Sequence, residues 1–486
     1  MGKITFYDGV KEIGGTKIFL EISKKRFFLD FGMNYKKRNL FFEEYLNPRV
    51  ANGIGDLYFL DLIPKIKGLY RKDLVKFIRQ EGVEELGDGK EKDFVDGVFL
   101  SHAHFDHSGY ITFLREEIPV YTSKITETIL RAMEDVSVTQ FETSIFKFIR
   151  RPAVKTYKDP EYYGTHNAVN ISGKLTFNSV NVFSYPVDHS VPGAMGFVFT
   201  GNEGAIVYTG DLRLHGKHAK DTEDFVENAR AFKPKILIIE GTNLRGENKS
   251  SEKEFWTEEK VYERARDVIK KTTGLVMADF SIRDVNRFMT FYNLAKENKR
   301  KFVITLKDAY LLNAMHNAGM GVPSLNDPLI YVYLKKKKTG TYDMKKDYSE
   351  KWIKKLFELN IKTVKASDIR KNEGDYVFVM RYWDLQELID LRPPKGSKYI
   401  HSSSEAHSEE QEIDEWRMNN WLKKFGLYPR EHIHASGHAR KEDLFKIVSE
   451  INPEIIIPVH TEHPEEYVNK FGSKVKIVEE GETISF

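Results

Sequence analysis

The stretch "SHAHFDHSGY", Ser101–Tyr110, places three histidines and one aspartate within six consecutive residues. The apolar run "DGVFL" just before it predicts a short buried strand. His102 and His104 are two residues apart, so on an extended segment their side chains point to the same side. Asp106 and His107 follow on the predicted turn into a helix. Imidazole nitrogens and carboxylate oxygens suit zinc or a similar divalent ion, so the stretch predicts a metal site with ligands for two adjacent ions.

Composition narrows the class of protein. A chain of 486 residues is too long for one core of usual size and predicts two domains. It has no cysteine, which excludes disulfides, thiolate metal ligands and a cysteine nucleophile. The formal charge is only +3, and for the basic runs at 146–151 and 334–338 a solvated surface is favoured over a nucleic-acid patch. No apolar run approaches the ~18 residues of a membrane helix, so we expect a cytoplasmic protein without membrane contact.

Three further candidate ligands end later strand-like runs. "PVDHSVPG" supplies His189, "VYTGDLRLHG" supplies Asp211, and "IIPVHTEHP" supplies His460. Taken singly, each is more typical of a hydrogen-bonded turn residue than of a ligand. Taken with the histidine cluster, the set favours metal binding, because a metal site needs ligands from several strand ends.

The histidine cluster followed by His189, Asp211 and His460 resembles the metallo-β-lactamase fold, an αββα sandwich with a dinuclear metal site at one edge. The resemblance implies two divalent metal ions, zinc with manganese as the alternative, each held by three residues, and one bridging ligand. One metal would be held by His102, His104 and His189, the other by Asp106, His107 and His460, with Asp211 bridging them.

The middle of the chain resembles the β-CASP nucleases, and within them ribonuclease J and its archaeal relatives. After "IIEGTN" the pattern changes from hairpin-like strands to alternating helices and short strands, which is typical of a parallel sheet. The resemblance implies a first part of the metallo-β-lactamase domain at 1–244, an inserted β-CASP domain at 245–395 and a return segment at 396–486. The family's motifs A, B and C would be Glu240, His438 and His460, and a histidine at motif C accompanies RNA substrates.

These residues allow a mechanism to be expected. A two-metal site lowers the pKa of a bridging water and holds phosphoryl oxygens. Asp106, Glu240 and His438 form the expected catalytic set. His438 would protonate the leaving oxygen or stabilise developing charge. Glu240 would orient a ligand histidine, with an ordinary strand-end acid as the alternative.

Several small polar residues are candidates for binding the substrate. In "HASGHA" a hydroxyl, free backbone N–H groups and an imidazole could hold a phosphate beside His438, although a polar turn before a helix is the simpler interpretation. "ADFSIRDVNRF" and "HSSSEAHSEE" offer serines after predicted strands, where helix caps are equally expected. The candidates are Ser281, Ser403, His434, Ser436 and Gly437.

We therefore expect a metal-dependent ribonuclease that hydrolyses single-stranded RNA. The resemblance to ribonuclease J implies an exonuclease that works from the 5′ end. Some family features differ: "EGTN" stands for "ESTN", "HTE" for "HGE", and "FVMRYWDLQEL" lacks a Gly-Ser-Gln-Gly-Glu-like motif. The alternatives are a hydrolase of the same fold acting on DNA or on a small ester or phosphodiester, and a non-hydrolytic RNA-binding protein. The seven filled ligand positions argue against the last. A homodimer is left open.

Overall fold

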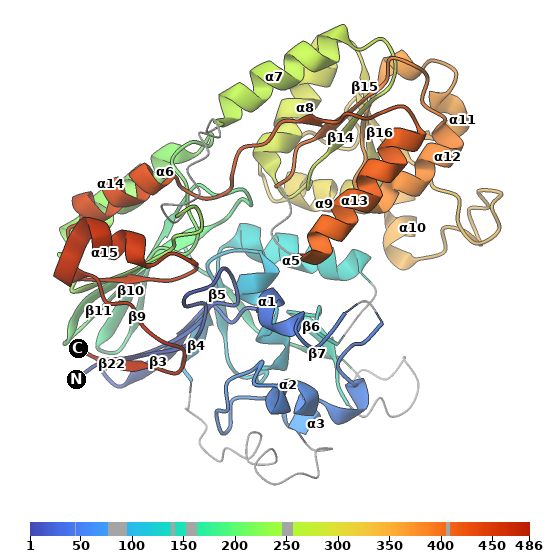
Figure 1. Cartoon of the computed structure of the whole chain (residues 1–486). Coiled ribbons are helices and arrows are strands. Elements are labelled where there is room, and N and C mark those ends of the chain that lie inside the picture. Colours follow the sequence, from blue (N-terminus) through green and yellow to red (C-terminus); the bar gives the residue numbers. More distant parts are fainter. Residues whose placement is uncertain (44, 76–94, 138–140, 152–162, 245–255, 405–408) are drawn as a thin grey trace. The chain divides into compact units, whose positions relative to one another are not determined.

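The computed structural model describes the chain apart from residues 44, 76–94, 138–140, 152–162, 245–255 and 405–408 (Figure 1). The chain divides into two compact units, each built from more than one segment. The first unit comprises Met1–Leu214, His218–Ser251 and His438–Phe486; the second comprises His215–Lys217 and Glu252–Gly437.

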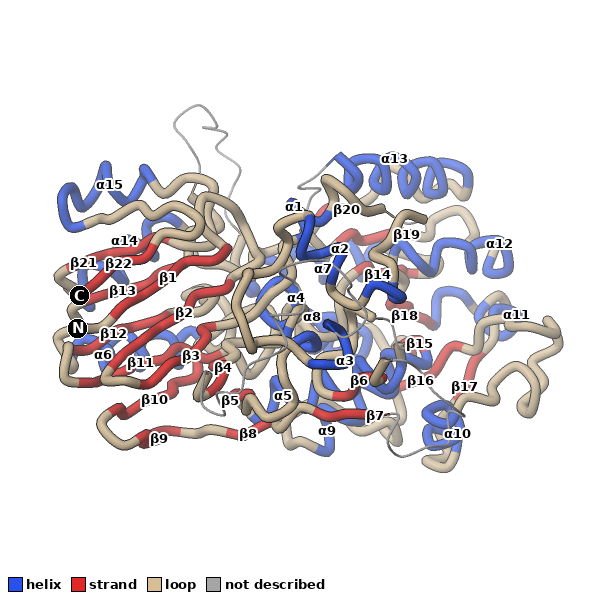
Figure 2. The backbone as a smooth tube through the Cα atoms, turned by 90° about the horizontal axis from the view of Figure 1, so that it is seen from below, coloured by secondary structure: helices blue, strands red, loops and turns tan. Residues whose placement is uncertain are grey.

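One seven-stranded sheet of the first unit has the order β22-β1-β2-β3-β4-β5-β8. Its strands are β1 Lys3–Asp8, β2 Lys17–Ile22, β3 Lys25–Leu29, β4 Gly97–Phe99, β5 Val120–Thr122, β8 Ala168–Asn170 and β22 Thr483–Ser485. Strands β1 to β3 form the antiparallel meander that their alternating apolar residues predict. From β3 onward the neighbours are parallel. The C-terminal β22 pairs with β1, so the two termini lie side by side (Figure 2).

The second sheet of this unit has the order β21-β13-β12-β11-β10-β9. Its strands are β9 Gly173–Phe177, β10 Val180–Pro186, β11 Met195–Gly201, β12 Gly204–Tyr208, β13 Ile236–Ile239 and β21 Ile455–Pro458. Side chains of both sheets form one apolar core that includes Phe27, Phe99 and Phe199. The αββα fold class expected from the sequence is therefore confirmed.

Helices and short elements complete the first unit. The helices are α1 Tyr35–Arg38, α2 Gly55–Phe59, α3 Lys72–Val75, α4 Phe105–Ser108, α5 Lys124–Val136, α6 Ala219–Ala231, α14 Lys441–Ile451 and α15 Glu465–Phe471; β6 Lys147–Ile149 and β7 Tyr163–Thr165 form a hairpin. Single 3₁₀ turns span Val50–Asn52, Ile111–Phe113 and Gly472–Lys474. The apolar sides of α6 and α14 pack on the outer face of the second sheet.

The second unit is a parallel seven-stranded sheet of order β17-β16-β15-β18-β14-β19-β20. Its strands are β14 Val276–Asp279, β15 Lys301–Thr305, β16 Ile330–Tyr333, β17 Thr363–Val364, β18 Tyr376–Val379, β19 Lys398–His401 and β20 Glu431–His432. Its helices are α7 Glu258–Lys271, α8 Val285–Glu297, α9 Leu306–Asn317, α10 Lys351–Phe357, α11 Ala366–Ile369, α12 Leu388–Leu391 and α13 Glu409–Lys424, with 3₁₀ turns at Glu373–Asp375 and Tyr382–Glu387. The βαβ pattern expected here is thus observed.

The boundary between the units differs from the sequence expectation at one end. We expected the return segment to begin at residue 396, but the second unit continues to Gly437. The reason is strand pairing: β19 pairs with β14, and β20 pairs with β19. The other expected boundary, between residues 244 and 245, lies at the edge of the undescribed stretch 245–255.

Candidate metal centre

Five strands of the first unit deliver polar side chains at their carboxyl ends. The segment after β4 carries the histidine cluster, and the loops after β10, β12, β13 and β21 carry His189, Asp211, Glu240 and His460. Strands β12, β13 and β21 are parallel, so their carboxyl ends meet at one edge of their sheet. Helix α4 begins directly after His104, which turns Asp106 and His107 towards the same edge.

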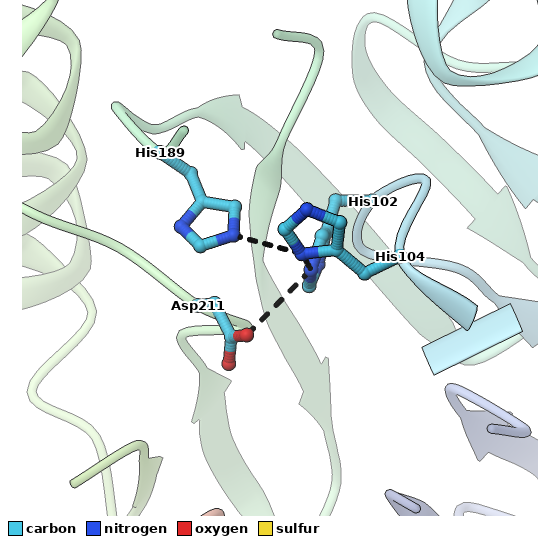
Figure 3. Close-up of side chains that lie close together, drawn as sticks. All are labelled: His102, His104, His189 and Asp211. Atoms are coloured by element: carbon cyan, nitrogen blue, oxygen red, sulfur yellow. Dashed lines mark hydrogen bonds and ion pairs between the residues drawn. The ribbon is translucent and has the colours of Figure 1, made fainter. Parts of the chain in front are cut away.

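Three imidazoles converge at the first part of this cluster (Figure 3). His104 Nδ1 lies 3.0 Å from His102 Nε2 and 3.2 Å from His189 Nε2. Asp211 Oδ2 lies 3.6 Å from His102 Nε2. One ligand atom from each of these four residues lies within 4.8 Å of all the others. Such a donor set matches a divalent cation bound by nitrogen and oxygen.

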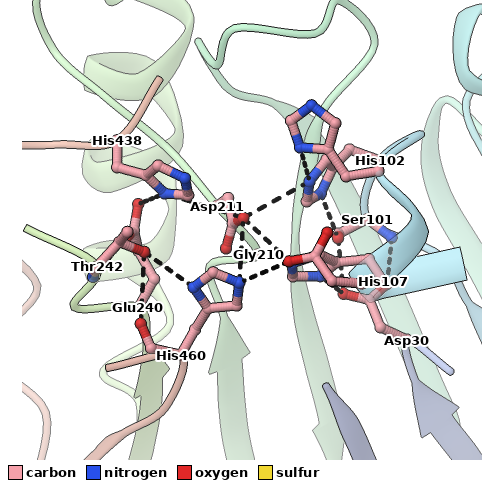
Figure 4. Close-up of polar contacts among 12 residues, drawn as sticks. Asp30, Ser101, His102, His107, Gly210, Asp211, Glu240, Thr242, His438 and His460 are labelled. Carbon is pink, nitrogen blue, oxygen red and sulfur yellow. Dashed lines mark hydrogen bonds and ion pairs between the residues drawn. The ribbon is translucent and has the colours of Figure 1, made fainter. Parts of the chain in front are cut away.

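A second group, which includes His107 and His460, also lies close to Asp211 (Figure 4). His460 Nε2 is 3.1 Å from Asp106 Oδ2, and His107 Nε2 is 3.7 Å from the same oxygen. Asp211 Oδ2 is 3.1 Å from His107 Nε2 and 3.7 Å from His460 Nε2. The seven residues singled out as ligands in the sequence are therefore brought together, with Asp211 touching both groups.

The polar atoms of this cluster fit a bound cation. Both carboxylate oxygens of Asp211, and Nε2 of His107, are buried and make no hydrogen bond to the described residues. Buried acceptors without a donor are costly, and a metal ion satisfies several of them at once. His104 Nδ1 lies within 3.2 Å of ring nitrogens of both His102 and His189. A bound cation explains this packing too, because the lone pairs of neighbouring ring nitrogens repel each other unless a proton or a metal ion lies between them.

Asp30 forms hydrogen bonds to residues within and beside the cluster, and we did not predict this role from the sequence. Its carboxylate accepts hydrogen bonds from the Ser101 backbone N–H at 2.6 Å, the Ser101 hydroxyl at 2.7 Å and the Tyr208 hydroxyl at 2.6 Å. His107 Nδ1 lies 2.7 Å away, so its proton faces Asp30 and Nε2 is left free to bind a metal. The available signal was an acid ending the apolar run "FFLDFG".

The partner of Glu240 differs from our expectation. Its carboxylate is buried and lies 3.1 Å from Nδ1 of His438, not against a ligand histidine of the cluster. Backbone N–H groups of Leu212 and Thr242 donate to it at 3.1 and 3.0 Å, which fixes its orientation. The ligand candidate His460 is instead oriented by the Thr242 hydroxyl, 2.8 Å from its Nδ1.

Burial and the nearby carboxylates shift the pKa values of the clustered histidines in both directions; that of the ligand candidate His107 is raised, because Asp211, Asp106 and Asp30 outweigh its burial. Burial lowers the pKa of His102 and His189 well below the ordinary value, so both remain neutral and able to bind a metal. For His438, burial also acts downward, but Glu240 and Asp211 outweigh it and raise its pKa to about 9. His438 can therefore carry a proton at neutral pH, as a general acid must.

The other predicted substrate residues belong to the second unit. The Ser281 hydroxyl accepts from the backbone N–H of Arg283 at 3.4 Å, while the cap of α8 is Asp284. Ser403 donates to the Asp279 carbonyl at 3.4 Å. Ser281 thus makes a local turn contact, whereas Ser403 contacts the end of the neighbouring strand β14.

In "HASGHA", His434 Nδ1 lies 3.3 Å from a guanidinium nitrogen of the buried Arg287. The Ser436 carbonyl lies 2.8 Å from Nε2 of His215. Gly437 is the last residue of the second unit, directly before His438. A substrate role for the second-unit residues stays a prediction.

Acidic side chains of the same unit neutralise most of the basic run at 334–338. Lys335 pairs with Asp384, Lys336 lies 2.6 Å from Asp390, and Lys337 lies 3.2 Å from Glu350. These contacts agree with a solvated surface rather than a free cationic patch.

Two family models match the chain. A β-lactamase superfamily domain matches residues 78–267, and a Zn-dependent metallo-hydrolase RNA specificity domain matches residues 429–477. Both matches agree with the resemblance to the metallo-β-lactamase fold and its β-CASP nucleases. No helix in the described part of this protein is both long and apolar enough to cross a membrane.

Known relatives support this assignment. Ribonuclease J 2 of Staphylococcus saprophyticus is 24% identical over 422 residues, covering 82% of this chain and 65% of the relative. Ribonuclease J 2 of Streptococcus pyogenes is 23% identical over 310 residues, covering 63% and 46%. The chain thus spans less than two thirds of these relatives' length. A protein of unknown function from Enterococcus faecalis shares the fold, with a TM-score of 0.73, 24% identity and 99% of both chains covered.

Proposed function

We propose that the protein is a metal-dependent ribonuclease that hydrolyses phosphodiester bonds of single-stranded RNA, acting as a 5′-3′ exonuclease. The observation that carries the proposal is the buried cluster in which Asp211 contacts two groups of metal-ligand type. The RNA specificity domain and the relatives named ribonuclease J 2 support RNA as the substrate.

We assign two divalent cations, zinc or manganese, to this cluster. His102, His104 and His189 would hold the first ion and Asp106, His107 and His460 the second, and Asp211 would contribute to both positions. When bound, such ions supply a hydroxide nucleophile at neutral pH and stabilise charge on the phosphate.

The chain's own residues supply the remaining chemistry. His438 faces Glu240 through Nδ1, which leaves the Nε2 proton for the leaving oxygen of the cleaved phosphodiester. Glu240 stabilises the protonated imidazole and holds its ring plane. Asp30 fixes the tautomer of His107, which leaves its Nε2 for a metal, and Thr242 orients the His460 ring through Nδ1.

The test compares three substrates with purified protein and Zn²⁺ or Mn²⁺: 5′-monophosphorylated RNA, matched DNA and a generic phosphodiester. Stepwise shortening of RNA alone supports the proposal. Turnover of DNA or of the generic diester alone supports the alternative, a hydrolase of the same fold that acts on DNA or on a small ester or phosphodiester. RNA binding without turnover in either metal would favour a non-hydrolytic protein.

A matched pair of variants tests the role of His438. His438→Ala should lower the cleavage rate by about 10²–10⁴-fold, the usual contribution of a general acid, without loss of metal. The control is His218→Ala, because the His218 side chain is 67% exposed and lies outside the cluster. Loss of metal from His438→Ala would show that His438 is a ligand.

A further inference from the structure

Two buried ion pairs of the first unit border the metal cluster from different sides. One is Asp188–Arg213, whose side chains are 1% and 0% exposed. The other is Asp8–Lys17, whose side chains are 5% and 1% exposed. Charges so completely removed from water are costly, and they persist where each compensates the other.

The Asp188–Arg213 pair joins two loops that carry ligand candidates. Arg213 Nε lies 3.3 Å from Asp188 Oδ2, and the Arg213 backbone N–H donates to the Asp188 carbonyl at 2.8 Å. Asp188 directly precedes His189, and Arg213 follows Asp211 by two residues. The Thr222 hydroxyl on α6 accepts from the Asp188 backbone N–H at 2.8 Å. The loop of His189 is therefore fixed to the loop of Asp211 and to a packed helix.

The Asp8–Lys17 pair closes the loop between β1 and β2. Asp8 and Lys17 are register partners, and Lys17 Nζ donates to Asp8 Oδ2 at 2.8 Å and to the Gly15 carbonyl at 3.0 Å. Asp8 Oδ1 also accepts from Asn34 Nδ2 at 2.8 Å and from Lys37 Nζ at 2.9 Å, so two lysines compensate its charge. The pair thus fixes both ends of the segment 9–16.

This segment contacts two of the three residues assigned to the second metal position, Asp106 and His460. The Thr16 backbone N–H donates to the Asp106 carbonyl at 3.1 Å, and the His460 backbone N–H donates to the Gly9 carbonyl at 2.8 Å. His460 has a left-handed backbone with φ of 51°, which is strained for a histidine and must be held by such contacts. A Cβ on Gly14 would stand 2.9 Å from Asp106 Oδ2, so the segment lies directly against this carboxylate.

We propose that the two ion pairs position the two halves of the dinuclear centre separately: Asp188–Arg213 holds the first metal position through His189, and Asp8–Lys17 holds the second through Asp106 and His460. The proposal rests on the proposed function only in that the cluster binds two metals. Neither pair touches the reacting atoms, so these are positioning residues, and their removal acts by moving ligands.

The experiment measures metal binding rather than activity. The purified 486-residue protein and two variants, Arg213→Met and Lys17→Met, are dialysed against Co²⁺ of increasing concentration. Bound metal is measured by elemental analysis and the ligand field by visible absorption. Wild type should bind two ions. Each variant should keep one tightly bound ion and bind the other about 10–100-fold more weakly, the usual effect of losing an outer partner of a ligand.

The absorption spectrum tells which ion each variant keeps. Lys17→Met should keep the ion bound by three imidazoles, and Arg213→Met the ion bound by two imidazoles and Asp106, so the two spectra should differ. Arg213→Lys and Lys17→Arg retain the charges and should restore most of the lost affinity. Arg71→Met is the matched control, because Arg71 is also buried and pairs with Asp73, away from the ligands; it should bind two ions like wild type.

The outcomes separate this inference from the proposed function. If wild type binds no metal, the proposed function fails, and this inference falls with it. If wild type binds two ions and both variants do so with wild-type affinity and spectra, the inference is overturned and the proposed function stands. Equal loss of both ions in both variants would also overturn it. Should Arg213→Met not fold, the double variant Asp188→Leu/Arg213→Met removes both buried charges and gives the same readout.

Discussion

Asp30→Ala provides the sharpest test of how the metal cluster is supported. The substitution removes a fully buried carboxylate that accepts from two groups of Ser101, from Tyr208 and from His107. Each buried donor left without a partner costs about 1–3 kcal/mol, so four donors give a loss of at least about 4 kcal/mol in the free energy of unfolding. The freed His107 ring should also bind metal more weakly, by about 10–100-fold.

The assay must distinguish the two units. All five tryptophans, 256, 352, 383, 416 and 421, lie in the second unit, so their fluorescence follows that unit alone. The first unit is followed by hydrogen exchange of β4 and β12 in urea with a chelator present, which removes any contribution from metal. Asp30→Ala should lower protection there and leave the tryptophan transition less affected.

Asp96→Ala is the control, because this carboxylate is partly exposed at 18% and accepts from Lys25 Nζ at 2.6 Å and the Arg26 backbone N–H at 2.8 Å. It should cost about 1 kcal/mol or less. An Asp30→Ala loss no larger than that of the control would refute the reasoning.

Three further predictions follow from the described residues. Burial and Arg71 lower the pKa of His166 to about 3, so this histidine is protonated readily only in the unfolded chain. The free energy of unfolding should therefore decrease below pH 6.5, by about 2 kcal/mol at pH 5. His166→Phe should remove this difference between urea titrations at pH 8 and pH 5. An unchanged pH dependence in the variant would contradict that assignment. Gly32→Ala would place a Cβ 1.6 Å from the Asp106 carbonyl oxygen, so it should lower the melting temperature, and unchanged melting would show that the ligand helix can shift freely. Removing metal with a chelator should reduce the hydrogen-exchange protection of the first unit and leave the tryptophan unfolding transition unchanged, because a ligand stabilises only the state that binds it. An equal loss of stability in both units would contradict the assignment of the metal to the first unit.

The sequence predicted the fold class and most of the cluster because the relevant signals are local. Three histidines within six residues carry their geometry in their spacing, and His189 and His460 end apolar strands that can be recognised individually. Asp30 was missed because a single acid after a strand is common, and its role depends on Tyr208 and Ser101 from distant segments.

The partner of Glu240 could not be predicted for a related reason. Glu240 and His438 are 198 residues apart, and long-range contacts bring them together: the Asn243 amide donates to the His438 carbonyl at 2.8 Å, and the Ala439 backbone N–H donates to the Leu212 carbonyl at 2.7 Å. The strands at 398–401 and 431–432 follow the boundary expected at residue 396, yet they pair within the sheet of the second unit. Their neighbours, not their composition, decide the sheet to which they belong.

The first unit is built from segments that lie before and after the second unit in the sequence, and this order affects how it folds during synthesis. Strand β21 completes the second sheet, β22 completes the first by pairing with β1, and His438 and His460 come from the same late segment. A ribosome-bound chain that has exposed everything up to the second unit therefore still lacks two histidines of the centre and an outer strand of each sheet. The second unit can fold while the first still lacks these elements, so the histidine cluster can be completed only after residues 438–486 have left the ribosome.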